Sequence, residues 1–131
     1  MTSQYTPQEA ANRQLVLDMY ARVLQPLDSS HIDEFFTSDY IQHNPSVVTG
    51  PSGLKGLLDR ARLQSPHAEH RIKRVFADGD HVIAHVHLII NPGELGRAVV
   101  DIFRIQDGKI AEHWDVAQPV PENPANDNTM F

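Results

Sequence analysis

Histidines alternate with apolar residues in the segment HVIAHVHLII, residues 81–90. His81, His85 and His87 occupy odd positions, and every even position is apolar. Alternate side chains of a β-strand point to opposite faces, so a strand here would have one apolar face and one face of imidazoles. Imidazoles in a row can transfer protons, line a polar pocket or bind a transition metal.

A second set of residues suited to acid–base chemistry lies nearer the C-terminal end. Asp101 stands in VVDIF, and His113 and Asp115 stand two residues apart in EHWDV. A carboxylate beside an imidazole can work as a general acid and base, provided that both reach the same reacting group. The pairing of the two segments decides whether these three side chains meet.

The hairpin RIQDGKI between the two segments allows two registers. A two-residue turn at DG would set Asp101 beside Trp114. A three-residue loop at QDG, with its glycine in the left-handed position of a bulge, would set Asp101 on one face with His113 and Asp115. We favour the second register because it separates polar residues from an apolar set on the other face (Val100, Ile102, Trp114 and Val116).

Two of the histidines can share that polar face. If the preceding hairpin pairs odd positions with odd positions, His85 and His87 join it, interleaved with apolar side chains (Ile83, Ile89, Val99 and Phe103). An exposed face would not need so many aliphatic residues, and a dry core would not tolerate so many unpaired ionisable groups. This mixture predicts a pocket between a sheet and helices.

Helix signals dominate the N-terminal half. TPQEAANRQ opens with a capping box, Thr6 with Glu9, and Pro7 at the first helical position; this helix is expected to end near Pro26. SSHIDEFF predicts a short second helix, and Pro51 begins a third. The intervening DYIQHNPSVVTG is expected to be irregular.

Strand signals follow, at residues 69–76, 80–91, 97–106 and 109–118. Their connectors are too short for parallel crossovers, so we expect an antiparallel meander. The predicted fold is α+β, with three N-terminal helices packed on a curved antiparallel sheet. We expect a single domain over residues 1–118, an extended or disordered tail over 119–131, and a homodimer formed through the sheet's apolar face.

Composition narrows the possible partners. The 131 residues include 17 acidic and 11 basic ones, for a net charge of −6, which argues against nucleic acid or an anionic membrane as a partner. There is no cysteine, so thiolate chemistry is excluded. The N-terminus lacks the layout of a signal peptide, and we expect a cytoplasmic protein.

Two stretches, DYIQHNPSVVTGPSGLKGL and VVDIFRIQDGKIAEHWDV, resemble the SnoaL-like polyketide cyclase group of the nuclear transport factor 2-like superfamily. The resemblance runs from the first helix to about Pro119. It implies a cone-shaped α+β barrel, usually dimeric, with a pocket between the helices and the concave sheet. In these cyclases an aspartate on the last strand is the general acid and base for an intramolecular aldol condensation, without metal or organic cofactor.

Individual positions carry this resemblance further. The cyclase aspartate matches Asp115, a neighbouring pocket histidine matches His113, and the asparagine before proline matches Asn44. Where characterised cyclases have a histidine on the penultimate strand, this chain has Asp101, and a second carboxylate would change the proton chemistry. The related limonene epoxide hydrolases have an Arg-x-Asp pattern that falls here on His85 and His87, which do not match.

We therefore predict a cofactor-independent enzyme that abstracts a proton next to a carbonyl, as in aldol cyclisation or isomerisation. The predicted catalytic residues are Asp115, His113 and Asp101, and the predicted substrate contacts are Asn44, His43, His85, His87 and Phe103. The alternatives are a non-catalytic module that binds a small molecule and a hydrolase that activates water with two carboxylates. Metal binding by His85 and His87 is disfavoured, and no metal is predicted; His70 is assigned to the surface or a strand edge.

Overall fold

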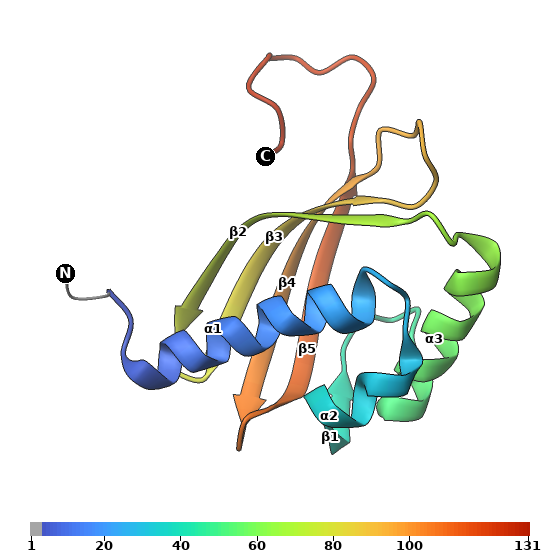
Figure 1. Ribbon diagram of the computed structural model, residues 1–131. Coiled ribbons are helices and arrows are strands. Elements are labelled where there is room, and N and C mark those ends of the chain that lie inside the picture. The colour runs from blue at the N-terminus through green and yellow to red at the C-terminus, as the bar shows by residue number, and fades with distance from the viewer. Residues whose placement is uncertain (1–3) are drawn as a thin grey trace.

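The computed structural model describes residues 4–131 (Figure 1). The helical elements are α1 (Pro7–Met19), the π-helical turn η1 (Tyr20–Leu24) that continues it, the 3-10 turn η2 (Ser29–His31), α2 (Ile32–Phe35) and α3 (Pro51–Gln64). The strands are β1 (Phe36–Gln42), β2 (Glu69–Asp78), β3 (His81–Ile89), β4 (Arg97–Gln106) and β5 (Lys109–Pro119). Among these elements, no helix is long and apolar enough to cross a membrane.

The first helix begins as the sequence predicts. The Thr6 hydroxyl accepts the backbone N–H of Glu9, and the Glu9 carboxylate accepts the backbone N–H of Thr6, which completes the capping box. Val16 and Met19 are fully buried, as is Val23 in the π-helical turn. Figure 1 shows this continuous helix lying across the concave face of the sheet, where these side chains form the core.

The five strands form one sheet in the order β1-β5-β4-β3-β2. All pairs are antiparallel except β1 with β5, which is parallel. The α+β architecture of three helices on a curved sheet is therefore confirmed, but the sheet is mixed. The extra strand occupies part of the segment expected to be irregular. Only Phe36 and Tyr40 are buried in it, four residues apart, so the alternation that marks a half-buried strand is missing.

The β4–β5 hairpin differs from the prediction in its turn but not in its faces. Its turn has two residues, Asp107 and Gly108, with φ values of 51° and 75°, which suit a type I′ turn. A bulge next to Arg104 then shifts the register by one residue, so that Asp101 lies opposite Asp115. The predicted three-residue loop is wrong, yet the bulge brings the acidic residues to one face, as the loop would have done.

The β3–β4 hairpin pairs odd with even positions, so the odd-with-odd expectation is wrong. Ala84 lies opposite Asp101, and His85 lies opposite Val100. The side chains that share the helix-facing side with Asp101 are therefore Val82, Ala84 and Val86, which are 0 to 1% exposed. Because these small apolar side chains pack against α1, the imidazoles of His85 and His87 fall on the outer face of the sheet.

Residues 120–131 contain no helix or strand. Figure 1 shows this segment turning back beside the end of the sheet that carries the β3–β4 connection. The ring of Phe131 stacks on His87 and His85, with centroids 4.2 and 5.6 Å away. The alternating histidines of β3 thus contact the end of this segment on the outer face.

Candidate active site

A cavity of about 220 Å³ lies between the helices and the concave face of the sheet. Helical residues such as Met19, Leu24 and Leu57 form one side, and residues of β3, β4 and β5 form the other. Five of the eight predicted site residues line it: Asn44, Asp101, Phe103, His113 and Asp115.

The other three predicted site residues lie on the outer face of the sheet instead. The His43 ring stacks on Trp114 with centroids 4.8 Å apart, and its Nε2 lies 2.7 Å from Glu112. His87 Nε2 lies 2.7 Å from the carbonyl oxygen of Leu95. His85 lies on the same face of β3 as His87 and contacts Arg74 and Phe131. The expectation that His43, His85 and His87 contact a ligand in the pocket does not agree with this geometry.

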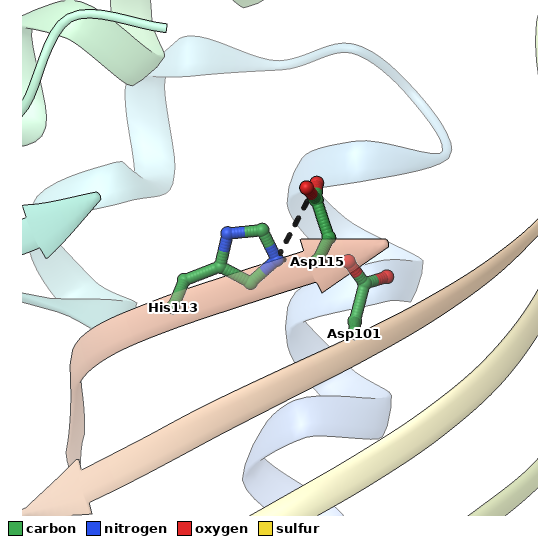
Figure 2. A group of neighbouring side chains, drawn as sticks. All are labelled: Asp101, His113 and Asp115. Carbon is green, nitrogen blue, oxygen red and sulfur yellow. Dashed lines mark hydrogen bonds and ion pairs between the residues drawn. The ribbon is translucent and has the colours of Figure 1, made fainter. Parts of the chain in front are cut away.

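Asp101, His113 and Asp115 project from neighbouring strands towards one point (Figure 2). His113 Nε2 lies 2.8 Å from Asp101 Oδ1 and 4.0 Å from Asp115 Oδ2. Asp101 is 9% exposed and His113 is 8% exposed, so both ionisable groups have little water to solvate them. Buried polar groups of this kind need hydrogen-bond partners, and each has them.

Tyr20 supplies a partner for Asp101 from the opposite layer. Its hydroxyl donates a hydrogen bond to Asp101 Oδ2. Burial, with the nearby Asp101 charge as a smaller cause, holds the pKa of Tyr20 well above its usual range, so the hydroxyl keeps its proton. Tyr20 is the first residue of the π-helical turn, a local widening of the helix that is frequent at functional sites.

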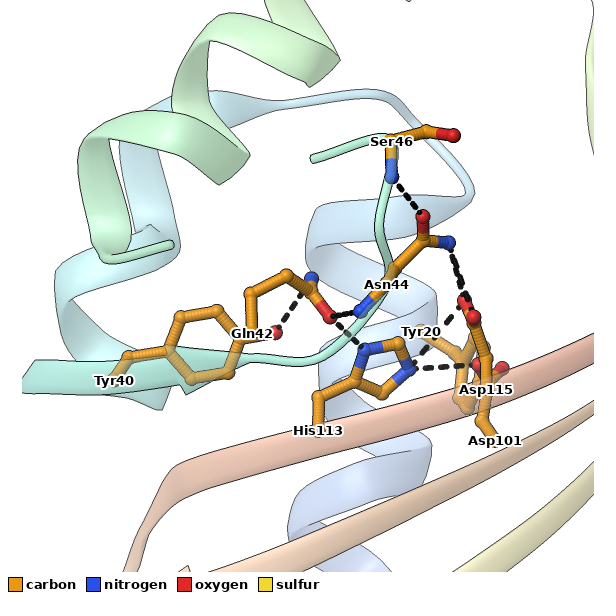
Figure 3. Close-up of polar contacts among 8 residues, drawn as sticks. All are labelled: Tyr20, Tyr40, Gln42, Asn44, Ser46, Asp101, His113 and Asp115. Carbon is orange, nitrogen blue, oxygen red and sulfur yellow. Dashed lines mark hydrogen bonds and ion pairs between the residues drawn. The ribbon is translucent and has the colours of Figure 1, made fainter. Parts of the chain in front are cut away.

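Gln42 fixes the protonation of one nitrogen of His113 (Figure 3). Gln42 Oε1 accepts the backbone N–H of Asn44 at 3.1 Å, so this atom must be the amide oxygen and can only accept. The same oxygen lies 2.7 Å from His113 Nδ1, which must therefore carry a hydrogen. Because Nδ1 carries its own hydrogen, a proton between His113 Nε2 and Asp101 is shared by those two groups.

Asn44 orients Asp115. Its Nδ2 lies 3.0 and 2.9 Å from the two carboxylate oxygens of Asp115. The amide cannot be turned round, because its Oδ1 accepts the backbone N–H of Ser46 at 2.9 Å. Figure 3 shows Asn44 above Asp115 on the side away from the strand, so the carboxylate is held by the loop that follows β1.

Tyr40 adds a hydroxyl at the wall of the cavity. It is 3% exposed, and its oxygen accepts a hydrogen bond from Gln42 Nε2 at 3.0 Å. Burial, with smaller contributions from the charges of Asp101 and Asp115, raises the pKa of Tyr40 well above its usual range. The hydroxyl therefore remains protonated and has its own hydrogen to donate.

Sequence reasoning did not assign to the site four polar residues that line this cavity, Tyr40, Gln42, His70 and Arg97, or Tyr20, which hydrogen-bonds Asp101. Tyr40, Gln42 and Asn44 lie at every second position, as side chains on one face of a strand do. This spacing would have placed them on one face if β1 had been predicted. His70, expected at the surface or a strand edge, is half-buried and lines the cavity. Tyr20 was counted only as part of the apolar stripe of the first helix.

The three acid–base side chains also have the composition of a metal site. Asp101, His113 and Asp115 each offer one ligand atom, and these atoms lie within 4.8 Å of one another. A cation here would compete with the hydrogen bonds from Tyr20 to Asp101 and from Asn44 to both oxygens of Asp115. The prediction that the protein needs no metal stays a prediction.

The comparison with family models identifies one family. The sequence model of the SnoaL-like domain matches residues 16–113. No sequence among curated proteins matches the chain. A structure from Bacillus cereus ATCC 10987, named as a candidate polyketide cyclase, is similar over 86% of this chain and 78% of its own, with 23% identity and a TM-score of 0.74.

Two further structures show the same fold. One is a candidate SnoaL-like polyketide cyclase from Jannaschia sp. CCS1, with 19% identity over 88% of this chain and 91% of its own, and a TM-score of 0.70. The other is an epoxide hydrolase from M. tuberculosis that resembles limonene epoxide hydrolase. It has 25% identity over 86% of each chain and a TM-score of 0.69.

Proposed function

Because the chain belongs to the SnoaL-like domain family of the nuclear transport factor 2-like superfamily, we propose that it is an enzyme that abstracts a proton next to a carbonyl group. The observation that carries this proposal is the 4.0 Å distance between His113 Nε2 and Asp115 Oδ2. A base and a proton donor at that separation can reach the α-hydrogen and the carbonyl oxygen of one small substrate together.

Asp115 is the base in this proposal. Asn44 holds its carboxylate in place, and the shared proton of Asp101 and His113 lies next to it. When Asp115 removes the α-hydrogen, negative charge develops on the carbonyl oxygen. The Asp101–His113 pair, or the hydroxyl of Tyr40, donates a hydrogen bond to that oxygen and stabilises the enolate.

The enolate then has two outcomes. It can attack a second carbonyl in the same molecule, which is an aldol cyclisation, or, in a substrate whose carbon–carbon double bond is conjugated with the enolate, take a proton back at the γ-carbon, which is an isomerisation. Asp115 returns the proton in either case. No electron is transferred, so the proposed reaction uses no redox cofactor.

Exchange of substrate hydrogen in D₂O tests proton abstraction directly. Simple ketones and keto acids are incubated with the protein, and loss of the α-hydrogen signal is followed by proton NMR. The proposal expects exchange well above the buffer rate, which falls in Asp115→Asn. Asp59→Asn, a change of an exposed carboxylate on α3, is the matched control and should exchange like the unchanged protein.

A water-activating hydrolase is the second candidate. The favouring observation is the presence of two carboxylates in one cavity, one held by Asn44 and the other beside His113. Opening of an epoxide needs a base for water and an acid for the leaving oxygen, and this pair would supply both. Incorporation of ¹⁸O from labelled water into a diol, without α-hydrogen exchange of ketones, would favour this function. Ligand binding with neither reaction would favour a non-catalytic binding module.

We also propose a homodimer, in the cytoplasm, formed through the outer face of the sheet. Val116 is 74% exposed there, Phe76 is 49% exposed and Val100 is 39% exposed. Trp114 and Ile102, half-buried, lie opposite each other on the same face. Contiguous exposed apolar side chains of this extent are typical of an interface.

A further inference from the structure

We propose that the end of the cavity remote from Asp115 binds an anionic group of the substrate, and that Arg97 is the residue that binds it. Resting on the proposed function, this assigns the substrate class: a small, largely apolar keto acid, with its ketone at the Asp101–His113–Asp115 end and its carboxylate at Arg97. Arg97 lines the same cavity as those three residues.

The register of the sheet places Arg97 relative to the acid–base residues. Arg97 and Asp101 both belong to β4 and point to the same face, because they are four positions apart. A strand rises by about 3.3 Å per residue, so their Cα atoms lie about 13 Å apart along β4. The cavity therefore has two polar ends.

Apolar side chains separate these two ends. Val86, Val99 and Ala117 line the sheet side between them, and Leu24 and Leu57 line the helical side. A ligand that fills the cavity would need an apolar middle. The volume of about 220 Å³ is below the range of roughly 300–1,000 Å³ typical of pockets for drug-sized ligands, which favours a small substrate.

Arg97 has a charge without a counter-charge. Within residues 4–131, Arg97 forms neither an ion pair nor a hydrogen bond through its side chain, whereas Arg22, Arg71 and Arg104 each contact a carboxylate. Arg97 is exposed, and the exposed Arg60 on α3 likewise has no ion pair or side-chain hydrogen bond among the described residues, so what distinguishes Arg97 is that it lines the cavity. A guanidinium matches a carboxylate with two parallel hydrogen bonds.

His70 is a second polar group at the same end. Leu88 pairs with His70 on one side and with Arg97 on the other, so the three form one row across the sheet. Neighbouring strands lie about 4.8 Å apart, which puts His70 and Arg97 about 10 Å apart across that row. His70 Nδ1 is buried without a hydrogen-bond partner in the part of the chain described, and the ring lines the cavity. A carboxylate above Leu88 would lie between the two side chains.

Calorimetry with a matched pair of ligands tests this assignment. The probes are 7-oxooctanoate and its methyl ester, which share the ketone and the apolar chain and differ in the negative charge. A hydrogen-bonded charge pair should make the acid bind about tenfold to a hundredfold more tightly than the ester. Arg97→Gln should remove that preference, and Arg97→Lys should restore part of it. Arg60→Gln, a change of an exposed arginine on α3, is the control and should keep the preference.

Equal affinity for acid and ester, or a preference that survives Arg97→Gln, would overturn the assignment, as would the absence of binding by both ligands at millimolar concentration. Because binding is measured without turnover, the two proposals can fail separately. A preference for the acid that depends on Arg97, without α-hydrogen exchange, would keep the anion site and contradict the enzymatic proposal. Exchange of neutral ketones with no preference for acids would keep the enzymatic proposal and contradict the anion site.

Discussion

Gln42 Oε1 lies 2.7 Å from Nδ1 of His113 and obliges that nitrogen to carry a proton. The amide orientation is not ambiguous, because the same oxygen accepts the backbone N–H of Asn44. His113 is thereby prepared to share a proton with Asp101 through Nε2, at 2.8 Å. The last residue of β1 thus determines which nitrogen of His113 carries a proton beside the Asp101–His113 pair on β4 and β5.

Gln42→Met should release His113 from this restriction. Methionine keeps the length of the side chain but offers no oxygen, so Nδ1 and the backbone N–H of Asn44 lose their acceptor. Each unsatisfied group costs about 1–3 kcal/mol in free energy of unfolding. In the unchanged protein, ¹⁵N NMR of the His113 ring should show Nδ1 protonated, and in Gln42→Met this signal should become a mixture of tautomers. Gln64→Met, at the exposed end of α3, is the control; an unchanged His113 spectrum in Gln42→Met would contradict the assignment.

Asp115→Asn should lower the rate of α-hydrogen exchange by roughly 10²–10⁴, because the base is lost while the shape is kept. Ligand binding, measured by calorimetry, should persist. Asp101→Asn should cost less, because Tyr20 and His113 can still hydrogen-bond the amide while the shared proton is lost. Full exchange by Asp115→Asn together with loss in Asp101→Asn would mean that the two carboxylates have exchanged roles.

Much of the fold was predictable because its signals are local. The capping box at Thr6 and Glu9 and the period of the strands after residue 66 depend on nearby residues only. The meeting of Asp101, His113 and Asp115 was predictable from a general preference for separating polar and apolar faces. The turn itself was not, since a bulge beside Arg104 and a three-residue loop bring the same side chains together.

The errors arose where distant segments decide the outcome. Alternation shows that His85 and His87 share a face, but not which face contacts α1; the small apolar set Val82, Ala84 and Val86 determined that. His43 follows a strand whose pairing with β5 is parallel and long-range, so no local pattern marks it. Tyr20 reaches Asp101 across 81 positions of sequence, a relation that one sequence does not contain.

Ile102→Glu should disrupt the proposed dimer. Ile102 lies opposite Trp114 on the outer face of the sheet, and a glutamate there would bury a charge in an apolar interface. Size-exclusion chromatography with light scattering should show a dimer for the unchanged protein and a monomer or aggregate for the variant. Leu63→Glu, at an 86% exposed position on α3, is the control. A variant that stays a stable dimer would place the interface elsewhere.

Elemental mass spectrometry of protein purified without chelators should find far less than one transition metal per chain. The reason is that hydrogen bonds from Tyr20 and Asn44 already engage the carboxylates of Asp101 and Asp115. Stoichiometric zinc or iron that disappears in His113→Gln would identify the three-residue cluster as a metal site. Metal that disappears only after His85 and His87 are changed to alanine would place it on the outer face.

His70 should make the protein less stable in mild acid. Burial lowers the pKa of His70 below its ordinary value of 6.5, and the charge of Asp101 opposes this as a smaller effect. Between pH 6.5 and that lowered pKa, the unfolded chain binds a proton at this position that the folded chain does not. The free energy of unfolding therefore falls as the pH falls through this window, by at most about 1.4 kcal/mol per pH unit for one proton.

Urea denaturation at several pH values should show that the free energy of unfolding depends less steeply on pH in His70→Gln than in the unchanged protein. His67→Gln, which changes an exposed histidine just before β2, should keep the original slope. Identical slopes in all three proteins would mean that His70 takes up its proton equally in the folded and unfolded states.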